Sequence, residues 1–128
     1  MPSDSFSRAP SAPSNQRRAP AEVARLVAAG RAVLVDVRAP DEWVATGVAA
    51  PAHLLALDDL TNGRKQWGSF LEQNRDREII LYCLSGSRSA YAARLLATEG
   101  FSAGNMGGLQ SWLNAGLPLR QPSASEMS

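Results

Sequence analysis

The sequence contains one cysteine and one histidine and carries almost no net charge, and each shortage excludes a class of function. A single cysteine cannot form an intramolecular disulfide framework or provide the several cysteine and histidine ligands of a structural zinc site. A formal net charge of +1 gives no strong field that would attract nucleic acid or an anionic membrane. No run approaches the roughly 20 apolar residues of a membrane span. We therefore expect no metal, no cofactor, no nucleic-acid partner and no membrane partner.

The two ends of the chain differ in composition from its middle. Residues 1–18 are rich in proline and serine, are mildly basic and have one isolated aromatic residue, Phe6. Such a segment offers too little apolar surface to offset the entropy of ordering, and it lacks the apolar region of a secretory signal. We expect residues 1–18 to be a disordered tail, 19–120 a single domain and 121–128 a flexible tail, in a cytoplasmic protein.

Helix-like and strand-like patterns alternate between these ends. Apolar residues recur at helical spacing in five segments: 20–29, 40–45, 67–73, 88–98 and 109–115. Apolar runs mark three strands, at 32–37, 53–57 and 78–82, and we expect a final short strand at 103–106. The alternation predicts an α/β fold with a small, mainly parallel central sheet of about five strands and helices on both faces. Ligands of such sheets bind beyond the carboxyl ends of the strands, and Cys83 lies at such an end.

The loop that begins at Cys83 connects the strand 78–82 to the helix 88–98. Successive amides of such a loop can curl into a nest for an anion, and its glycine permits a positive φ. A helix N-terminus and an arginine lower the pKa of a cysteine and make it a thiolate nucleophile. A cysteine that only packs in a core needs no loop of glycine and serine. We therefore predict that Cys83 is catalytic and that the substrate-binding residues are Leu84, Ser85, Gly86, Ser87, Arg88 and Ser89.

The single histidine, His53, lies in an apolar run, and we expect it to be structural or exposed at a rim. A cysteine without a histidine base must be activated by its own loop. This favours substrates whose reaction needs little proton removal by the enzyme, such as sulfane sulfur or phosphate esters.

Three charged residues follow the strand 32–37 and are expected near the same edge of the sheet: Asp36, Arg38 and Glu42. They can set the charge around the cysteine loop without taking part in the reaction. They can also form an ion pair or a helix cap that fixes the corner between the strand and the next helix. For these residues we favour the second interpretation over a catalytic role.

Three segments resemble the signatures of the single-domain rhodanese-like sulfurtransferases. They are residues 34–43, 82–89 and 100–118, in the order and spacing of that family over about residues 20–120. The resemblance implies that Cys83 takes a sulfane sulfur from a small anionic donor such as thiosulfate and forms a persulfide. It also implies that the sulfur passes to cyanide, to a thiol or to a protein acceptor. The family often has a histidine after the first signature, and residues 47–52 of this chain lack it.

The spacing between Cys83 and Arg88 distinguishes sulfur transfer from phosphatase or arsenate reductase activity, all of which the resemblance permits. The loop is six residues long, Cys-x4-Arg, whereas relatives that act as dual-specificity phosphatases or arsenate reductases have one residue more. The shorter loop suits a single sulfur atom, so we favour sulfur transfer. The alternatives are a phosphatase or arsenate reductase on the same fold, and a non-catalytic persulfide carrier or regulatory module. Because the loop has one arginine and no lysine, we expect modest affinity for thiosulfate.

Overall fold

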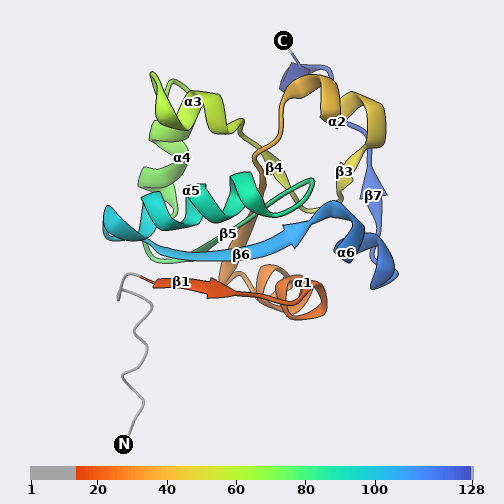
Figure 1. Ribbon diagram of the computed structural model, residues 1–128, viewed down its shortest axis with the longest axis horizontal. Helices are drawn as coiled ribbons and strands as arrows, with labels where there is room; N and C mark the ends of the chain where they lie inside the picture. Colours follow the sequence, from red (N-terminus) through yellow and green to blue (C-terminus); the bar gives the residue numbers. More distant parts are fainter. Residues whose placement is uncertain (1–13, 128) are drawn as a thin grey trace, which may run out of the picture.

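The computed structural model describes residues 14–127, which fold around a central sheet of five parallel strands (Figure 1). The order of the strands across the sheet is β1 (Ser14–Arg17), β6 (Ser102–Gly108), β5 (Glu78–Cys83), β2 (Ala32–Asp36) and β4 (His53–Leu54). Every neighbouring pair in this sheet is parallel. The predicted α/β fold with a mainly parallel sheet is therefore confirmed.

Strand β5 lies between β6 and β2 and is buried along its whole length. Its side chains alternate, so that Ile79 and Leu81 enter one core while Ile80 and Tyr82 enter the other. An unbroken apolar run is what a strand covered on both faces requires. The last residue of the strand, Cys83, belongs to the first core and lies at the carboxyl edge of the sheet.

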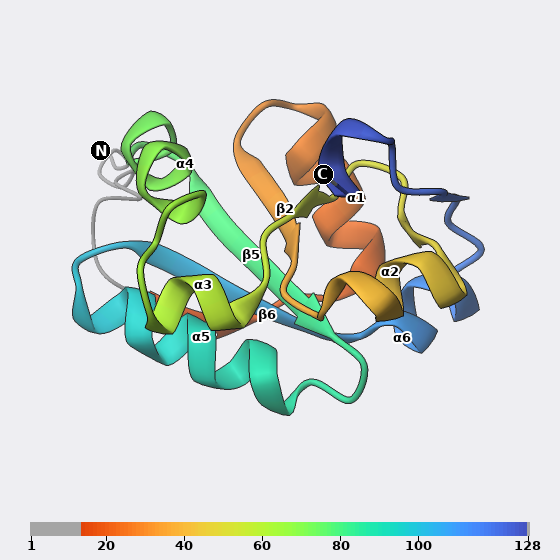
Figure 2. The ribbon, with the colours of Figure 1, turned by 90° about the horizontal axis from the view of Figure 1, so that it is seen from above.

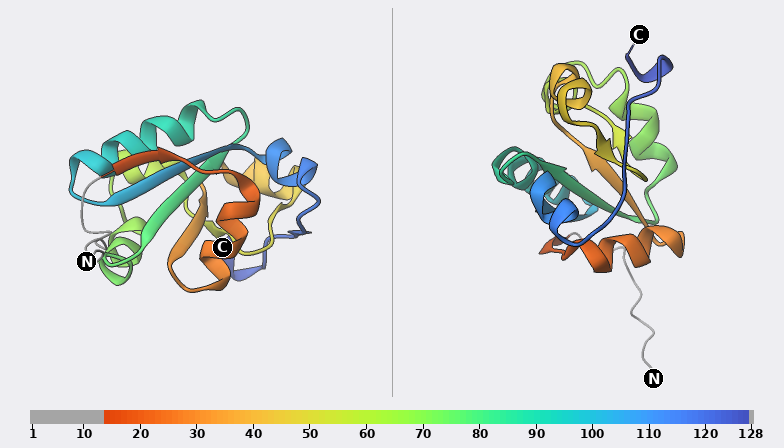
Figure 3. Two further views of the ribbon diagram at one scale, coloured as in Figure 1. Left: turned by 90° about the horizontal axis from the view of Figure 1, so that it is seen from below. Right: turned by 90° about the vertical axis from the view of Figure 1, so that its right-hand side faces the viewer.

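Six α-helices in the described part of the chain cover both faces of the sheet: α1 (Pro20–Ala28), α2 (Pro40–Thr46), α3 (Leu57–Thr61), α4 (Trp67–Gln73), α5 (Ser87–Thr98) and α6 (Leu109–Asn114). On one face, α3, α4 and α5 enclose a core that includes Trp67 and Leu96. On the other, α1, α2 and α6 bury a core that includes Val23 and Trp112. Figure 3 shows α1 on the opposite side of the sheet from α3.

Two short strands pair antiparallel in a second, smaller sheet: β3 (Val48–Ala49) and β7 (Leu119–Arg120). The Arg120 guanidinium donates hydrogen bonds of 2.7 to 3.0 Å to carbonyl oxygens of the turn 50–52 and to the carboxylate of Glu126. Ser125–Met127 form a 3-10 helix. Up to residue 127, the segment expected to be a flexible tail is therefore held against the domain by Arg120. Arg120 precedes that segment, so the composition of the segment alone does not indicate the contact.

Strand β1 lies within the segment that the composition assigns to a disordered tail. It pairs in parallel with β6. The next residue, Arg18, donates hydrogen bonds of 2.6 and 2.8 Å to the carboxylate of Glu78 and one of 2.8 Å to that of Glu22. The fold therefore includes residues 14–18, which precede the expected domain boundary, because an edge strand is held by its backbone and leaves little trace in composition. The rest of the expected tail, residues 1–13, lies outside the described residues.

The other predicted elements lie within a few residues of their observed positions, with one exception. The strand expected at 53–57 spans only His53–Leu54, because Leu57 already begins α3. Helix α3 has five residues, which is too short for helical periodicity to be visible in the sequence. Between residues 14 and 127, no helix has both the length and the apolar character needed to cross a membrane.

Candidate active site

The Cys83 side chain lies at the carboxyl end of β5 and is fully buried. The Gly86 amide donates a hydrogen bond of 3.0 Å to the sulfur, and the Ser89 hydroxyl lies 3.5 Å from it. Burial raises the pKa of Cys83. The Ser89 hydroxyl and the amides of Ser89, Gly86 and Arg88 lower that pKa by more, so it falls below its ordinary value. All of these donors belong to the cysteine loop and the first residues of α5.

Glycines allow this loop to rest directly on the backbone of β6. Gly86 immediately precedes α5 with a φ of +100°, which favours glycine. A Cβ at Gly86 would lie 3.2 Å from the Cα of Gly107. A Cβ at Gly108 would collide with the carbonyl oxygen of Leu84. The contact is therefore backbone against backbone, which fixes the amides that face the sulfur.

Three members of the predicted site are exposed to solvent and have no hydrogen bond to the sulfur among the contacts of the described residues. Leu84 is 57% exposed. The hydroxyls of Ser85 and Ser87 lie 3.2 Å apart and bind one another. The groups that approach the sulfur are backbone amides and one hydroxyl, so the outer side chains of the loop form a surface that an incoming molecule would meet.

Asn105, in β6, braces the loop and was not among the residues that the sequence pointed to. Its side-chain oxygen accepts hydrogen bonds from the Ser89 hydroxyl at 2.8 Å and from the Gly107 amide at 2.9 Å. Its side-chain nitrogen donates to the carbonyl oxygen of Gly86 at 3.3 Å. Asn105 is only 8% exposed. One signal could have identified it: an asparagine inside a strand that is expected to be buried needs hydrogen-bond partners, and a neighbouring parallel strand ends at the cysteine loop.

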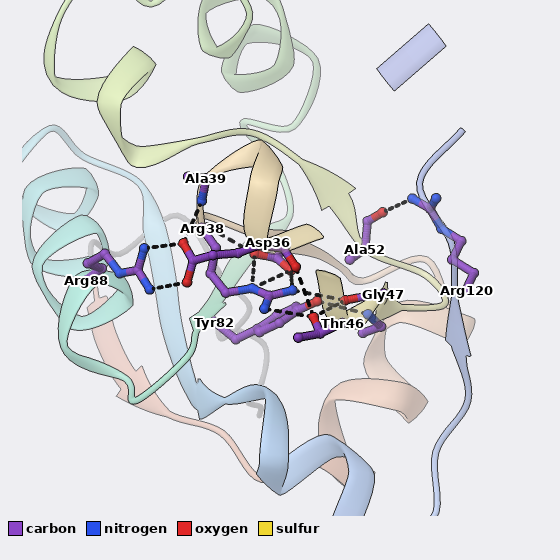
Figure 4. Close-up of polar contacts among 11 residues, drawn as sticks. Asp36, Arg38, Ala39, Thr46, Gly47, Ala52, Tyr82, Arg88 and Arg120 are labelled. Carbon is purple, nitrogen blue, oxygen red and sulfur yellow. Dashed lines mark hydrogen bonds and ion pairs between the residues drawn. The ribbon is translucent and has the colours of Figure 1, made fainter. Parts of the chain in front are cut away.

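The Arg88 guanidinium binds Glu42 in α2 (Figure 4). Two parallel hydrogen bonds of 2.8 and 3.0 Å join the two groups. Glu42 also accepts the amide hydrogen of Ala39 at 3.0 Å, which caps the first turn of α2. The hydrogen bonds from Arg88 lower the pKa of Glu42 to about 2 despite the opposing effect of burial, and the Ala39 amide contributes. The guanidinium of Arg88, which we predicted to bind the substrate, is therefore already paired with a carboxylate.

Asp36 and Arg38 form a fully buried ion pair at the carboxyl end of β2. The Arg38 guanidinium donates hydrogen bonds of 2.9 to 3.1 Å to both carboxylate oxygens. It also donates at 3.0 Å to the Thr46 hydroxyl and to the carbonyl oxygen of Gly47 (Figure 4). These bonds join β2 to the far end of α2. The arrangement supports the interpretation that Asp36 and Arg38 fix the corner between strand and helix.

A pocket of about 310 Å³ opens beside the loop. Its apolar walls are Val37, Ala39, Ala56 and Leu57, and its polar walls are Arg38, Asp58, Thr61 and Arg88. Figure 2 shows that β5 ends between α2 and the start of α5. His53 is exposed and packs against Phe70, with 5.0 Å between ring centroids. Within residues 14–127, no group of histidine, cysteine, aspartate and glutamate side chains could hold a metal ion.

Comparison with known proteins places this chain in a family. The sequence model of the rhodanese-like domain matches residues 19–115. The chain belongs to the rhodanese-like domain family. A sulfurtransferase from Allochromatium vinosum is 29% identical to it over 96 residues, which cover 70% of this chain and 79% of that protein. Strand β1 of this rhodanese-like chain lies outside the matched residues.

Two solved structures have the same fold. A rhodanese-related protein from Thermoplasma volcanium has a TM-score of 0.68 at 28% identity, and the alignment covers 84% of this chain and 99% of that one. A protein of unknown function from Rhodopseudomonas palustris, described as a possible tyrosine phosphatase, has a TM-score of 0.67 at 25% identity, with coverage of 82% and 84%.

Proposed function

We propose that this rhodanese-like domain transfers a sulfane sulfur from a donor such as thiosulfate to cyanide or a thiol, through a persulfide on Cys83. One observation carries the proposal: the only cysteine of the chain accepts the Gly86 amide at 3.0 Å inside a loop of the Cys-x4-Arg length. The lowered pKa of Cys83 and the similarity to the sulfurtransferase from Allochromatium vinosum support it.

The reaction consists of two displacements on sulfur. The Cys83 thiolate attacks the outer sulfur of thiosulfate, a new S–S bond forms, and sulfite leaves with the electron pair of the broken bond. Cyanide or a thiolate then attacks the terminal sulfur of the persulfide, which regenerates the Cys83 thiolate. Neither step requires a proton to be removed by the enzyme, and two half-reactions predict ping-pong kinetics. The loop amides stabilise the negative charge of the persulfide as an oxyanion hole stabilises oxygen.

The burial of Cys83 favours transfer of a single atom. Its side chain has no exposed surface, so the reacting atom of a donor must enter the loop to reach it. A terminal sulfur is one atom wide, whereas a phosphate ester brings a tetrahedral group. The short loop therefore argues for sulfur as the transferred group.

An intact-mass measurement tests the proposal. After incubation with thiosulfate, we expect the protein to gain the mass of one sulfur atom and to lose it again when cyanide is added. Cys83→Ser should show neither the adduct nor cyanide-dependent turnover, and Ser111→Ala, an exposed change on α6, should behave as the unmodified protein does. Full turnover by Cys83→Ser would refute a Cys83 persulfide.

Phosphate hydrolysis is the second candidate, because a similar fold occurs in the Rhodopseudomonas palustris protein described as a possible tyrosine phosphatase. Substantial hydrolysis of an aryl phosphate by the unmodified chain would reverse the ranking. Inserting one residue between Cys83 and Arg88 should increase this hydrolysis if loop length selects the substrate. A persulfide carrier, the third alternative, would load sulfur once but fail to turn over with cyanide or a small thiol.

A further inference from the structure

The charged groups around the pocket disfavour the binding of highly charged anions. Two arginines are among the residues that line the pocket, Arg38 and Arg88. The guanidinium of each is bound by a carboxylate, Asp36 and Glu42 respectively. Asp58 also lines the pocket, and its carboxylate accepts a hydrogen bond from the Asn62 side chain at 2.9 Å. The two ion pairs and Asp58 together carry a formal charge of −1 beside the Cys83 loop.

The Glu42–Arg88 pair is the part of this arrangement that a donor would meet. The Arg38 pair is fully buried, whereas the side chains of Arg88 and Glu42 are 38% and 27% exposed. Arg88 is the only cationic residue of the cysteine loop, and its amide is among the groups that lower the pKa of Cys83. The same residue thus reaches the sulfur with its backbone and Glu42 with its side chain.

We propose that Glu42 is a specificity-determining residue that neutralises the loop arginine and so disfavours dianionic sulfur donors relative to donors with at most one negative charge. This inference rests on the proposed sulfur transfer. The favoured donor class is an organic persulfide, R–S–SH, whose organic part has the apolar pocket walls beside the loop to lie against. A thiosulfate dianion gains no such contact and approaches a wall of net negative charge.

The charge balance of the two loading reactions explains the preference. With thiosulfate, a thiolate and a dianion combine, and sulfite leaves with two negative charges and the electron pair of the S–S bond. With a persulfide, the thiolate attacks the terminal sulfur, the S–S bond of the donor breaks, and R–S⁻ leaves with that electron pair while the proton stays on the transferred sulfur. The second reaction gathers less negative charge at the loop, so it depends less on a free cation.

Glu42→Gln tests the role of the carboxylate, because glutamine can still accept the Ala39 amide hydrogen and keep the cap of α2. The measurement is the rate of Cys83 persulfide formation with thiosulfate and with cysteine persulfide as donors, expressed as the ratio of their kcat/KM values. We expect this ratio to rise about fivefold in favour of thiosulfate. The rise should shrink with added salt, because charges near the surface are screened.

Two further variants isolate the charge pair. Glu99→Gln breaks the bidentate Arg64–Glu99 pair at the opposite end of α5 and makes the same change in net charge, so its ratio should match that of the unmodified protein. In Glu42→Gln/Arg88→Gln the gain should disappear. A gain that survives in this double variant, or an unchanged ratio in Glu42→Gln, overturns the inference.

The outcomes also separate this inference from the proposed function. If neither donor places sulfur on Cys83 in the unmodified protein, the sulfurtransferase proposal fails and the inference fails with it. If thiosulfate loads Cys83 with a higher kcat/KM than cysteine persulfide, only the inference fails. Should Glu42→Gln not fold, Arg88→Gln removes the cation and keeps the Glu42 carboxylate and the cap of α2. The ratio should then shift further against thiosulfate, and an unchanged ratio in that variant overturns the inference.

Discussion

The Ser89 hydroxyl can donate its single proton to the Cys83 sulfur, 3.5 Å away, or to Asn105, 2.8 Å away. It is one of the groups that lower the pKa of Cys83 against the effect of burial. We therefore expect Ser89→Ala to raise the pKa of Cys83, so that the thiolate forms at higher pH. Because Cys83 is the only cysteine, the ultraviolet absorbance of the thiolate against pH reports this pKa directly, with Cys83→Ala as the blank. Ser111→Ala should leave the titration where it is.

Removal of the Asn105 side chain should affect both the stability of the domain and the position of the cysteine loop. Asn105→Ala leaves the Gly107 amide and the Gly86 carbonyl oxygen without this partner in a buried region, which we expect to lower the free energy of unfolding by about 1–3 kcal/mol. Persulfide formation from thiosulfate should also slow at a temperature where the variant is fully folded. The matched control, Asn114→Ala, removes an exposed asparagine of α6. Normal loading by Asn105→Ala would show that the brace does not position the loop.

At the scale of elements, the sequence predicts helices and strands that have a local periodic pattern, and it does not predict those that tertiary contacts hold in place. The apolar run of β5, the helices on either side of it and the cysteine loop follow from periodicity and from one glycine. Strand β1 and helix α3 do not, because a four-residue edge strand and a five-residue helix carry almost no periodic signal. The partner of Arg88 was equally hidden, since Glu42 lies 46 residues away and only the fold brings α2 to the start of α5.

The attachment of β1 to the sheet gives a prediction at the scale of elements. Glu78 is buried at the start of β5, and Arg18 binds both of its oxygens. Arg18→Ala leaves that carboxylate without its main partner, so we expect the free energy of unfolding to fall by about 1–3 kcal/mol. This loss is smaller than the loss for a fully buried pair, because the Arg18 side chain is 21% exposed. Urea denaturation measures it, with the exposed Arg25→Ala as the control.

A second variant reaches the same pair without removing a charge. A Cβ at Gly104, in β6, would lie 2.5 Å from a carboxylate oxygen of Glu78 and 3.2 Å from the Cγ of Arg18. Gly104→Ala should therefore displace the ion pair and destabilise the protein in the same direction as Arg18→Ala. Because both changes act on one contact, the double variant should lose less than the sum of the two single losses. Strict additivity would mean that Gly104 and Arg18 act separately.

For the whole molecule, two arginine–carboxylate clasps make stability depend on pH: Arg88 with Glu42, which joins α5 to α2, and Arg120 with Glu126, which holds the C-terminal segment. The pKa of Glu126 is lowered to about 2, first by hydrogen bonds from Arg120 and also by the Ser123 amide, against the effect of burial. A carboxylate whose pKa is lower in the folded state stabilises the fold above its unfolded pKa. That stabilisation is lost as the pH falls through the folded value. Both clasps should therefore weaken between about pH 5 and pH 2.

Glu126→Gln isolates the C-terminal clasp from the active site. At about pH 7 we expect the variant to be less stable than the unmodified protein by ~1–2 kcal/mol, because the pair is partly exposed and screened. Near pH 2 the difference in the free energy of unfolding should be much smaller, since about half of the folded molecules then have a protonated Glu126. Glu72→Gln, at an ion pair with both side chains more than 60% exposed, should show no difference at either pH. A deficit in Glu126→Gln that stays constant from neutral to acid pH would contradict the ionic clasp and indicate lost packing instead.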